Sequence, residues 1–581
     1  MSKLNVDQKN IKILFSDKKS NFLIPDYQRP YAWDENQCQT LWDDIFSFAF
    51  PENNYQKFEQ NEEYFLGTIV TFENENNKKE VIDGQQRLTT LMLLLRAFYA
   101  KFGNMQDDNS KRTSESIAQC LWKTDEFGKA DFNILKIDSE VATDNDKDEF
   151  LEILKTGIIR KEHKSKYAKN YTFFQQKIDI FLSEYPSYFA YLPARILENC
   201  ILLPIEAESQ DTALRIFSTL NNRGLPLSDA DIFKAQFYKY YSAKSQKDEF
   251  IEKWKELEEI TSKIFKPLNG IPMDELFTRY MYFIRSKQGI KSSTTESLRK
   301  FYEKDKYAIL KHDDTLPNLK ILVDFWNDIY SQNTDRFSKN ILRKLFILNY
   351  APNGMWTYFL SVYFLHNKDK SNELEEAKLD KFLTKIIAFV WGFSFINPGV
   401  NALRTPVYAE MINVVTNQDV TFSDHKFNEN ILRSAINNFE FKNGRPITRS
   451  MLTWWSFINN VQDIPELNTN FDIEHIVARK RQENDKLLTD TKNLESLGNK
   501  SLLEDKINIR AADYRFSDKM KYYKGFTNDK GQRKEGTIIL ELKNLADTKP
   551  DFSEQDIMKR SEDISNQFLN FLKTNDLLKQ T

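Results

Sequence analysis

The chain contains little cysteine: Cys38, Cys120 and Cys200 are its three cysteines in 581 residues. Cysteines so far apart in sequence form neither a disulfide framework nor a zinc knuckle. No uninterrupted apolar run reaches membrane-spanning length, and residues 1–10 are too polar for the core of a signal peptide. These absences predict a cytoplasmic, reduced protein with no membrane partner, and they exclude structural zinc held by cysteine.

The chain also lacks a large excess of charge of one sign, because its formal net charge is −3. The whole molecule is therefore not an obvious polyanion binder. Residues 474–534 differ, because they carry fifteen Lys and Arg against ten Asp and Glu. Such a basic segment suits a DNA backbone, although a solvated surface is an equally common use. The chain is too long for one core, and we divide it into domains 1–240, 241–425 and 426–581.

The most informative stretch lies toward the C-terminus and combines acids, a histidine and two spaced asparagines. A short run of alternating apolar residues ends in Glu474 and His475, and Asn499 and Asn508 follow nine residues apart. A hard cation such as Mg²⁺ takes carboxylate and amide oxygens as ligands, and a neutral imidazole can accept a proton from an attacking water. Asp472 shares one side of the predicted strand with Glu474. The pattern fits a metal-dependent phosphodiesterase; the alternative is a surface histidine beside a carboxylate, with two turn asparagines.

A second informative segment joins a predicted strand to a very apolar helix. It consists of Asp83, Gly84, Gln85, Gln86 and Arg87. Strands are predicted over 64–72 and 80–82, and the helix over 88–102 ends at Gly103. A helix N-terminus after a glycine turn favours an anion, and the arginine can contact phosphate in a bidentate manner. The aspartate could bind a metal, and a glutamine could orient water or read a base edge. Alternatively, the aspartate caps the helix and the arginine pairs with a carboxylate.

A polar, aromatic loop lies upstream of this segment. Its residues are Tyr27, Gln28, Arg29, Pro30 and Tyr31. Pro30 favours an extended conformation for the residue before it. Asp34 then predicts a helix N-cap, and Gln37 completes a capping box three residues later.

The region 241–425 predicts one helix after another, without a repeat of fixed period. We interpret His312, His366 and His425 as structural or solvated, because they lack the spacing of metal ligands. The passage 211–231, just before this region, predicts a helix, a Gly-Pro turn and a second helix capped by Ser228. The sequence assigns no chemistry to the helical region.

The C-terminal residues resemble the HNH, or ββα-metal, nuclease motif in its His-Asn-Asn form. This resemblance implies that His475 is the general base, that Glu474 and Asn508 hold Mg²⁺ or Mn²⁺, and that Asn499 braces the loop carrying the histidine. Asp472 would then lie behind the ligands. The chain departs from the motif in its loop, with Ala478 where many relatives have proline and Lys500-Ser501 where they have an apolar residue and Thr. Both changes concern loop stiffness and leave the ligand set intact.

A further run, Phe516-x-x-Lys519-x-x-x-Tyr523, is also typical of the HNH domain in this family. Lys519 and Arg515 could contact the scissile strand, but solvated helix charges are an equally good account. The middle of the chain is predicted to couple the two ends.

Together, the Gln-Arg-Pro-Tyr loop and the Asp-Gly-x-x-Arg segment resemble the ParB-like N-terminal domain of GmrSD-type, modification-dependent restriction endonucleases. The resemblance covers residues 20–240 and 430–525. It implies binding and hydrolysis of a nucleoside triphosphate (GTP or ATP). The residues that it implies in nucleotide binding are Gln28, Arg29, Asp83, Gly84, Gln85, Gln86 and Arg87. Those implied in sensing DNA modification are Tyr27, Gln28 and Tyr31. Asn221 and Arg223 could reach the nucleotide cleft or form a structural turn.

We therefore expect an α+β, predominantly helical chain with a ParB-like α/β N-terminal domain, a helical middle domain and a ββα-metal C-terminal domain. The expected function is an NTP-regulated, Mg²⁺-dependent endonuclease or nickase acting on modified or phage double-stranded DNA in anti-phage restriction. One alternative is a ParB-like, nucleotide-gated DNA-binding switch without cleavage, and another is an NTP-driven enzyme acting on RNA. The sequence does not exclude a homo-oligomer.

Overall fold

The computed structural model describes most of the chain. The described residues are 5–6, 8–142, 144–160, 162, 164–210, 212–214, 216, 228–266, 271–399, 401–467 and 469–580. Asn221 and Arg223, which the sequence connects with the nucleotide cleft, lie outside this set. The chain forms two compact units, Met1–Glu256 and Leu257–Thr581. The domain boundaries placed at 240 and 425 stay predictions.

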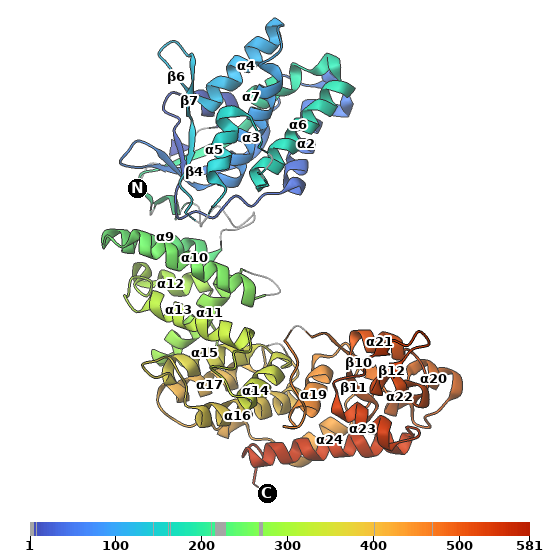
Figure 1. Ribbon diagram of the computed structural model, residues 1–581. Coiled ribbons are helices and arrows are strands. Elements are labelled where there is room, and N and C mark those ends of the chain that lie inside the picture. Colours follow the sequence, from blue (N-terminus) through green and yellow to red (C-terminus); the bar gives the residue numbers. More distant parts are fainter. Residues whose placement is uncertain are drawn as a thin grey trace. The chain divides into compact units, whose positions relative to one another are not determined.

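A mixed sheet organises the first unit (Figure 1). Its strands are β1 (Asn5–Val6), β2 (Lys9–Asn10), β3 (Phe22–Ile24), β4 (Tyr64–Glu73), β5 (Lys79–Asp83), β8 (Ile137–Ser139) and β9 (Cys200–Ala207). The order is β1-β9-β4-β5-β3-β8, and β2 also pairs with β9. β4 is antiparallel to β5 and parallel to β9, while β3 is parallel to both β5 and β8. A separate hairpin consists of β6 (Trp122–Thr124) and β7 (Ala130–Leu135).

The first unit also contains helices. They are α1 (Ile11–Ser16), α2 (Glu35–Ala49), α3 (Gln85–Phe102), α4 (Asp108–Leu121), α5 (Lys147–Thr156), α6 (Lys166–Glu184), α7 (Tyr191–Asn199) and α9 (Asp229–Ala243), with the 3-10 turns η1 (Pro51–Asn53), η2 (Tyr55–Lys57) and η3 (Pro186–Tyr188). The helix α10 (Lys247–Ile264) crosses from the first unit into the second.

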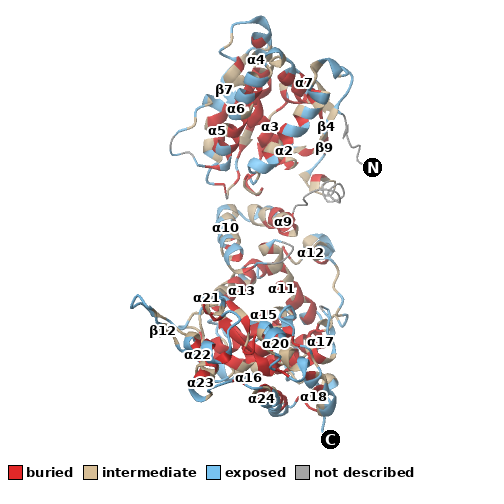
Figure 2. Ribbon diagram, turned by 90° about the vertical axis from the view of Figure 1, so that its right-hand side faces the viewer, coloured by how far each residue is buried: buried red, intermediate tan, exposed pale blue. Residues whose placement is uncertain are grey.

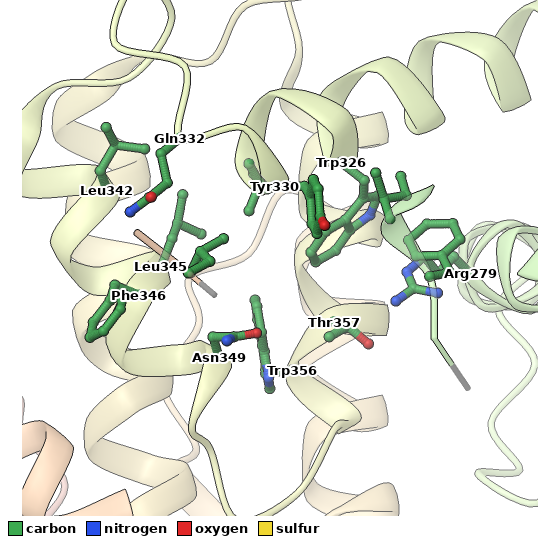
Figure 3. Close-up of a pocket in the computed structure, with 14 residues that line it drawn as sticks. Arg279, Trp326, Tyr330, Gln332, Leu342, Leu345, Phe346, Asn349, Trp356 and Thr357 are labelled. Carbon is green, nitrogen blue, oxygen red and sulfur yellow. The ribbon is translucent and has the colours of Figure 1, made fainter. Parts of the chain in front are cut away.

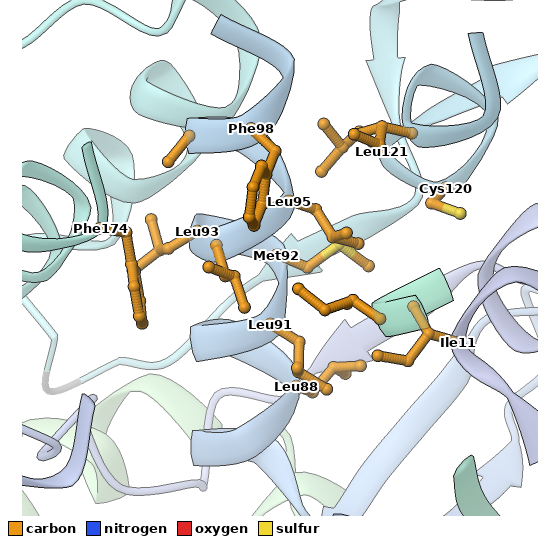
Figure 4. Close-up of a cluster of buried hydrophobic side chains, with 14 of the residues drawn as sticks. Ile11, Leu88, Leu91, Met92, Leu93, Leu95, Phe98, Cys120, Leu121 and Phe174 are labelled. Atoms are coloured by element: carbon orange, nitrogen blue, oxygen red, sulfur yellow. The ribbon is translucent and has the colours of Figure 1, made fainter. Parts of the chain in front are cut away.

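The helix α3 is the centre of the first unit's core. Figure 4 shows Leu88, Leu91 and Phe98 projecting from it among side chains of neighbouring elements. Residues 91–95 are all buried, so the helix is covered on every side. A helix that is apolar all round must be enclosed in this way. The predicted strand-turn-helix segment is therefore held at a rigid position.

Several elements follow directly from local sequence. The capping box of Asp34 and Gln37 is present at the start of α2, and Ser228 caps α9 with Asp231 as its partner. The strands predicted over 64–72 and 80–82 correspond to β4 and β5. The apolar helix begins at Gln85, three residues before its predicted start, because Gly84 occupies the N-cap position.

The second unit is mainly helical. Its helices are α11 (Pro272–Lys287), α12 (Leu298–Tyr307), α13 (Thr315–Tyr330), α14 (Lys339–Asn349), α15 (Met355–Asn367), α16 (Glu376–Ile396), α17 (Arg404–Val415), α18 (Glu429–Asn437), α19 (Pro446–Phe457), α20 (Arg479–Asp485), α21 (Asp505–Ala511), α22 (Phe516–Lys524), α23 (Leu540–Thr548) and α24 (Glu554–Thr574), with the 3-10 turns η5 (Ser423–His425), η6 (Thr491–Glu495) and η7 (Leu497–Asn499). Figure 2 shows buried residues concentrated around α15 and α16.

The described residues of this unit also form four short strands. The strand β10 (Phe471–His475) is antiparallel to β11 (Lys500–Glu504), and β12 (Phe526–Thr527) pairs with β13 (Arg533–Lys534). The helix α21 follows β11 directly, whereas α20, η6 and η7 separate β10 from β11 along the chain. The structure confirms the expected α+β, predominantly helical class.

Candidate nuclease site

The β10–β11 ladder places His475 and Glu474 at the end of a short sheet. Register pairs His475 with Lys500 and Glu474 with Ser501. Phe471 and Ile473 are buried, and because alternate residues of a strand share one face, this face of β10 packs against the core. The strand thereby fixes the positions of the acid and the histidine.

A cavity of about 230 Å³ collects three of the predicted site residues. Glu474, His475 and Asn508 all line it, although Asn508 comes from α21. Lys519 from α22 and Arg479 from α20 also line this cavity. The acid, the imidazole and the amide are thus brought to one place, as the spacing predicts.

Glu474 is held in a buried ion pair. Lys519 Nζ donates to Glu474 Oε1 at 2.7 Å, and Tyr523 Oη donates to the same oxygen at 2.6 Å. Burial raises the pKa of Glu474, although Lys519 and Tyr523 act in the opposite direction. Lys519 also donates to the carbonyl of His475 at 2.7 Å. The solvated-charge interpretation of Lys519 is therefore wrong, because helix spacing turns its side chain into the core, where it is fully buried.

Asn508 is oriented by the second acid of the strand. Its Nδ2 donates to Oδ2 of Asp472 at 3.1 Å. The amide nitrogen of Asn508 makes this bond, and the amide oxygen Oδ1 takes no part in it. Asp472 therefore lies behind the amide, as the strand alternation predicts.

A cluster of charges surrounds the ring of His475. Its Nε2 is buried and lies 3.4 Å from Oε1 of Glu495, without hydrogen-bond geometry to any described residue. Glu495 Oε2 accepts from Lys500 Nζ at 2.7 Å, and its Oε1 accepts from Arg479 Nη2 at 2.6 Å. Burial and the charge of Lys500 lower the pKa of His475 to about 4, and Glu495 offsets only part of this. The imidazole is therefore neutral at physiological pH.

Asn499 holds the backbone that follows the histidine. Its Oδ1 accepts from the Val477 amide at 2.8 Å, and its Nδ2 donates to the carbonyls of Val477 and Leu494 at 3.1 and 3.0 Å. Its own carbonyl accepts from the Ile476 amide at 2.8 Å. These bonds are those a bracing residue needs, and the role itself stays a prediction. At Ala478 φ is −66°, the value that proline fixes, so the chain keeps the extended turn without proline.

The helix α24 binds the loop that precedes β11. Arg560 on α24 is buried, and its Nη1 donates to the carbonyls of Leu497, Gly498 and Lys500 at 2.8, 3.0 and 2.7 Å. The amide of Gly498 donates to Ser561 Oγ at 2.9 Å. A Cβ at Gly498 would overlap the carbonyl oxygen of Ile557. Glycine is required because two backbones approach closely.

We expect Gly498→Ala to lower the free energy of unfolding by about 3 kcal/mol, because α24 must move away from the loop. Chemical denaturation measures the change. The matched control is Gly444→Ala, since a Cβ there meets nothing within 4 Å. Equal stability of the two variants would contradict the close approach.

A second cluster lies where β5 meets α3. Gly84 has a φ of 87°, and a Cβ there would lie 2.9 Å from the Thr68 carbonyl. Arg87 Nη1 donates to that carbonyl at 2.9 Å. Burial raises the pKa of Asp83, an effect that the Gly84 amide and Arg87 partly offset. Arg29 Nε is buried and has no hydrogen bond to a described residue. The guanidinium groups of Arg87 and Arg29 therefore lie near the N-terminus of α3.

Comparison with known families identifies both ends of the chain. Residues 11–238 match the N-terminal domain of the GmrSD restriction endonuclease. Residues 425–567 match the C-terminal domain of GmrSD restriction endonucleases. The chain belongs to the GmrSD restriction endonuclease family. It is accordingly a DNA endonuclease of restriction defence. A search of curated proteins finds no match.

In this GmrSD chain the two glutamines of the N-terminal motif face inward. Gln85 Nε2 donates to the Arg29 carbonyl at 3.2 Å. Gln86 Oε1 accepts from the Ala32 amide at 2.6 Å, and its Nε2 donates to the Pro30 carbonyl at 3.2 Å. They thus fasten the upstream loop to α3. Their predicted contacts with water or a base stay predictions.

The structure places the three residues predicted to sense modified DNA against β5 and α3, with Tyr27 and Gln28 bonded to β5 and Tyr31 bonded to Thr90 of α3. Tyr31 packs in the large core with α3, while Tyr27 packs in a smaller cluster with Val70 and Ile82. Gln28 Nε2 donates to the carbonyls of Val81 and Ile82, at 3.3 and 3.2 Å. All three side chains are buried. Their role in sensing DNA modification stays a prediction.

Sequence analysis did not single out Glu495 and Arg560 near the candidate nuclease site, and it named Tyr523 only as part of a family run, without a role. The i, i+4 spacing of Lys519 and Tyr523 could have placed both on one helix face. Glu495 carries no comparable signal, since its relation to His475 depends on the η6 turn. Within the described residues, no helix has the length and apolar character needed to cross a membrane.

Proposed function

We propose that this restriction endonuclease is metal-dependent and NTP-regulated, and that it cuts or nicks modified or phage DNA. The observation that carries the proposal is the shared cavity of Glu474, His475 and Asn508. An imidazole lies there beside two oxygen-bearing side chains, which is the set a hydrolytic phosphodiesterase needs. The cytoplasmic location stays a prediction.

The donor atoms of the cavity suit a hard cation such as Mg²⁺ or Mn²⁺. Asn508 would offer Oδ1, because its Nδ2 is engaged by Asp472. Glu474 would offer Oε2, because Oε1 already accepts from Lys519 and Tyr523. The described residues contain no group of three His, Cys, Asp or Glu side chains that could hold a metal. Waters and phosphate oxygens would complete the shell. When bound, the ion would neutralise charge on the phosphate and the leaving oxygen.

His475 acts as the general base in this mechanism. In the neutral tautomer with its proton on Nε2, the ring presents that proton toward Glu495, which leaves the lone pair on Nδ1. Nδ1 accepts a proton from water, whose oxygen attacks phosphorus as the bond to the 3′-oxygen breaks. The departing 3′-oxygen takes a proton from solvent, so the products are a 5′-phosphate and a 3′-hydroxyl. Glu495 stabilises the imidazolium that forms.

The pH dependence of cleavage tests this role of His475. Because its pKa is lowered to about 4, the base stays unprotonated through neutral pH and loses activity only as pH falls toward that value. We expect the acid limb of kcat/KM near pH 4, well below the ordinary histidine value of about 6.5. A limb between pH 6 and 7 would contradict the burial of the ring.

The cluster of Asp83, Arg87 and Arg29 would bind the triphosphate. Arg87→Ala is expected to lower NTP hydrolysis by about 10²-fold, because a charged contact to the transferring phosphoryl group is lost. Phosphate release, measured with GTP and with ATP, gives the effect. Arg112→Ala is the control, since Arg112 is exposed on α4. Unchanged hydrolysis by Arg87→Ala would remove this cluster from the nucleotide site.

The direct test is cleavage of modified phage DNA, plain DNA and RNA with Mg²⁺ and each NTP in turn. Metal- and NTP-dependent cutting of the modified DNA supports the proposal. Nucleotide-dependent DNA binding without cutting would favour the ParB-like switch instead. Preferred cutting of RNA would change the substrate class.

A further inference from the structure

Two cavities in the helical region of the second unit differ in their charge. One, of about 140 Å³, lies among α11, α13, α14 and α15 and is lined mostly by apolar and aromatic side chains (Figure 3). Arg279, the cation in its lining, donates to Glu275 at 2.6 Å. The other, of about 680 Å³, is lined by three lysines of α16 and by residues 574–576 at the end of α24. Neither the restriction activity nor the family assigns a role to this second space, which we call the lysine cavity.

The three lysines, called the lysine row, lie on one face of α16. Lys378, Lys381 and Lys385 have the i, i+3, i+7 spacing of a single helix face, and all three line the lysine cavity. At about 1.5 Å per residue, the row spans about 10 Å along the helix axis. Like charges at this spacing repel each other, so the row destabilises the helix unless negative charge neutralises it.

The described residues neutralise the lysine row only in part. Lys378 pairs with Glu375 at 2.6 Å on the exposed side of the helix. Lys385 Nζ donates to the carbonyl of Asn575, which carries no charge. Lys381 is exposed and forms no ion pair with a described residue. The row therefore retains positive charge that the described part of the chain does not balance.

Two acids also line the lysine cavity, but neither forms an ion pair with the row. Asp576 accepts from Lys426 Nζ at 2.8 Å through both of its carboxylate oxygens. Asp419 is exposed, so solvent screens its attraction for a lysine. Burial lowers the pKa of Lys385; Asp576 opposes this shift, and the charges of Lys426 and Lys381 add to it. The electrostatics of the cavity therefore favour an anion.

Tyr363 gives the cavity a hydroxyl that no described residue engages. Its side chain is only 8% exposed, it lines the lysine cavity, and its ring stacks on that of Phe382 with centroids 3.7 Å apart. Burial and the charge of Glu375 raise the pKa of Tyr363 to about 12, so the hydroxyl keeps its proton and remains a donor. A buried donor without a partner is unfavourable, and a ligand oxygen in the cavity would satisfy it.

We propose that the lysine cavity binds the phosphate chain of a small anionic ligand. Phosphate oxygens accept strong hydrogen bonds from ammonium groups and also accept from a hydroxyl, which are the donors present. A chain lying along α16 places its charges beside the lysine row. The volume of the cavity falls within the range of ligand pockets, about 300–1,000 Å³. The chain belongs either to inorganic polyphosphate or to a nucleoside triphosphate.

Calorimetric titration of the full-length protein with inorganic tripolyphosphate tests this site. Arg87→Ala protein is used without added Mg²⁺, so that the Asp83–Arg87 cluster and the candidate metal site add little. We expect tripolyphosphate to saturate one site and to bind more weakly as salt rises, because salt screens the lysines. The titration is repeated with GTP and ATP. Equal affinities identify the phosphate chain as the part that is recognised, and tighter binding of a nucleotide identifies a ligand that also carries a base.

Two variants locate the binding. Lys381→Gln removes a charge that no described acid pairs with, and Tyr363→Phe removes a hydroxyl that no described residue engages, so both proteins should fold. Each is expected to weaken tripolyphosphate binding about tenfold, because a hydrogen bond to a charged group is lost. The matched control is Lys370→Gln, at an exposed lysine between α15 and α16 that does not line the cavity, and it should bind as before. Absence of saturable binding, or unchanged affinity in either folded variant, overturns the proposal.

Discussion

His475→Ala is expected to lower the rate of DNA cleavage by about 10²–10⁴-fold, because the group that accepts the proton of the attacking water is removed. The ring lines the nuclease cavity and is held neutral by burial and by Lys500. Supercoiled plasmid or phage DNA with Mg²⁺ and NTP gives the rate from the appearance of nicked and linear products.

The control for this variant is His312→Ala, since His312 is an exposed histidine of the same unit. NTP hydrolysis by His475→Ala should match that of the unaltered protein, because the Asp83–Arg87 cluster lies in the other compact unit. Full cutting by a pure His475→Ala preparation would refute the assignment. Loss of both cutting and hydrolysis would instead indicate a general folding defect.

Lys519→Met is expected to have the largest effect on stability. The substitution leaves the carboxylate of Glu474 buried without its cationic partner, and breaking such a pair costs about 3–5 kcal/mol. The bond from Lys519 to the His475 carbonyl is lost as well, so the end of β10 loosens. Chemical denaturation measures the stability, and the cleavage assay should show a parallel loss of activity.

Lys521→Met is the matched control, because Lys521 is exposed on the same helix. The pH dependence adds a second reading. The pKa of Glu474 is already raised by burial, and losing Lys519 raises it further. Because the folded state then binds a proton more tightly than the unfolded state, lowering the pH below this pKa should recover part of the lost stability. A variant as stable as the control at neutral pH would show that the pair is not buried as described.

Local patterns gave reliable predictions where a short stretch carries all the information. The capping boxes of Asp34 and Ser228 depend on residues three positions apart, and both are present. The alternation of β10 predicted Asp472 and Glu474 on one side, and the resemblance to the HNH motif grouped Glu474, His475 and Asn508. The structure places these three at one cavity, and their roles stay predictions. The same reasoning treated Lys519 as an open question, because helix charge alone does not reveal burial.

The aromatic loop near the N-terminus illustrates the opposite case. The family resemblance implies that Tyr27, Gln28 and Tyr31 sense DNA modification, and this role stays a prediction. The chain turns at this point, so Tyr27 and Tyr31 join different core clusters. Gln85 and Gln86 bond to the loop backbone, a contact that the motif does not reveal, and their predicted contacts with water or a base stay predictions. A motif indicates which residues belong together, but it does not fix the direction of each side chain.

The sequence by itself determined the family and the α+β class, and it led to the proposal that Glu474, His475, Asn499 and Asn508 form the nuclease site, because these inferences depend on residue type and spacing along one chain. Only the tertiary structure decided how their charges are balanced. Glu495 and Lys500 surround the histidine, and Lys519 compensates the acid, through contacts between separate elements. The physical reason is that burial and long-range pairing set protonation, and neither is written in local periodicity.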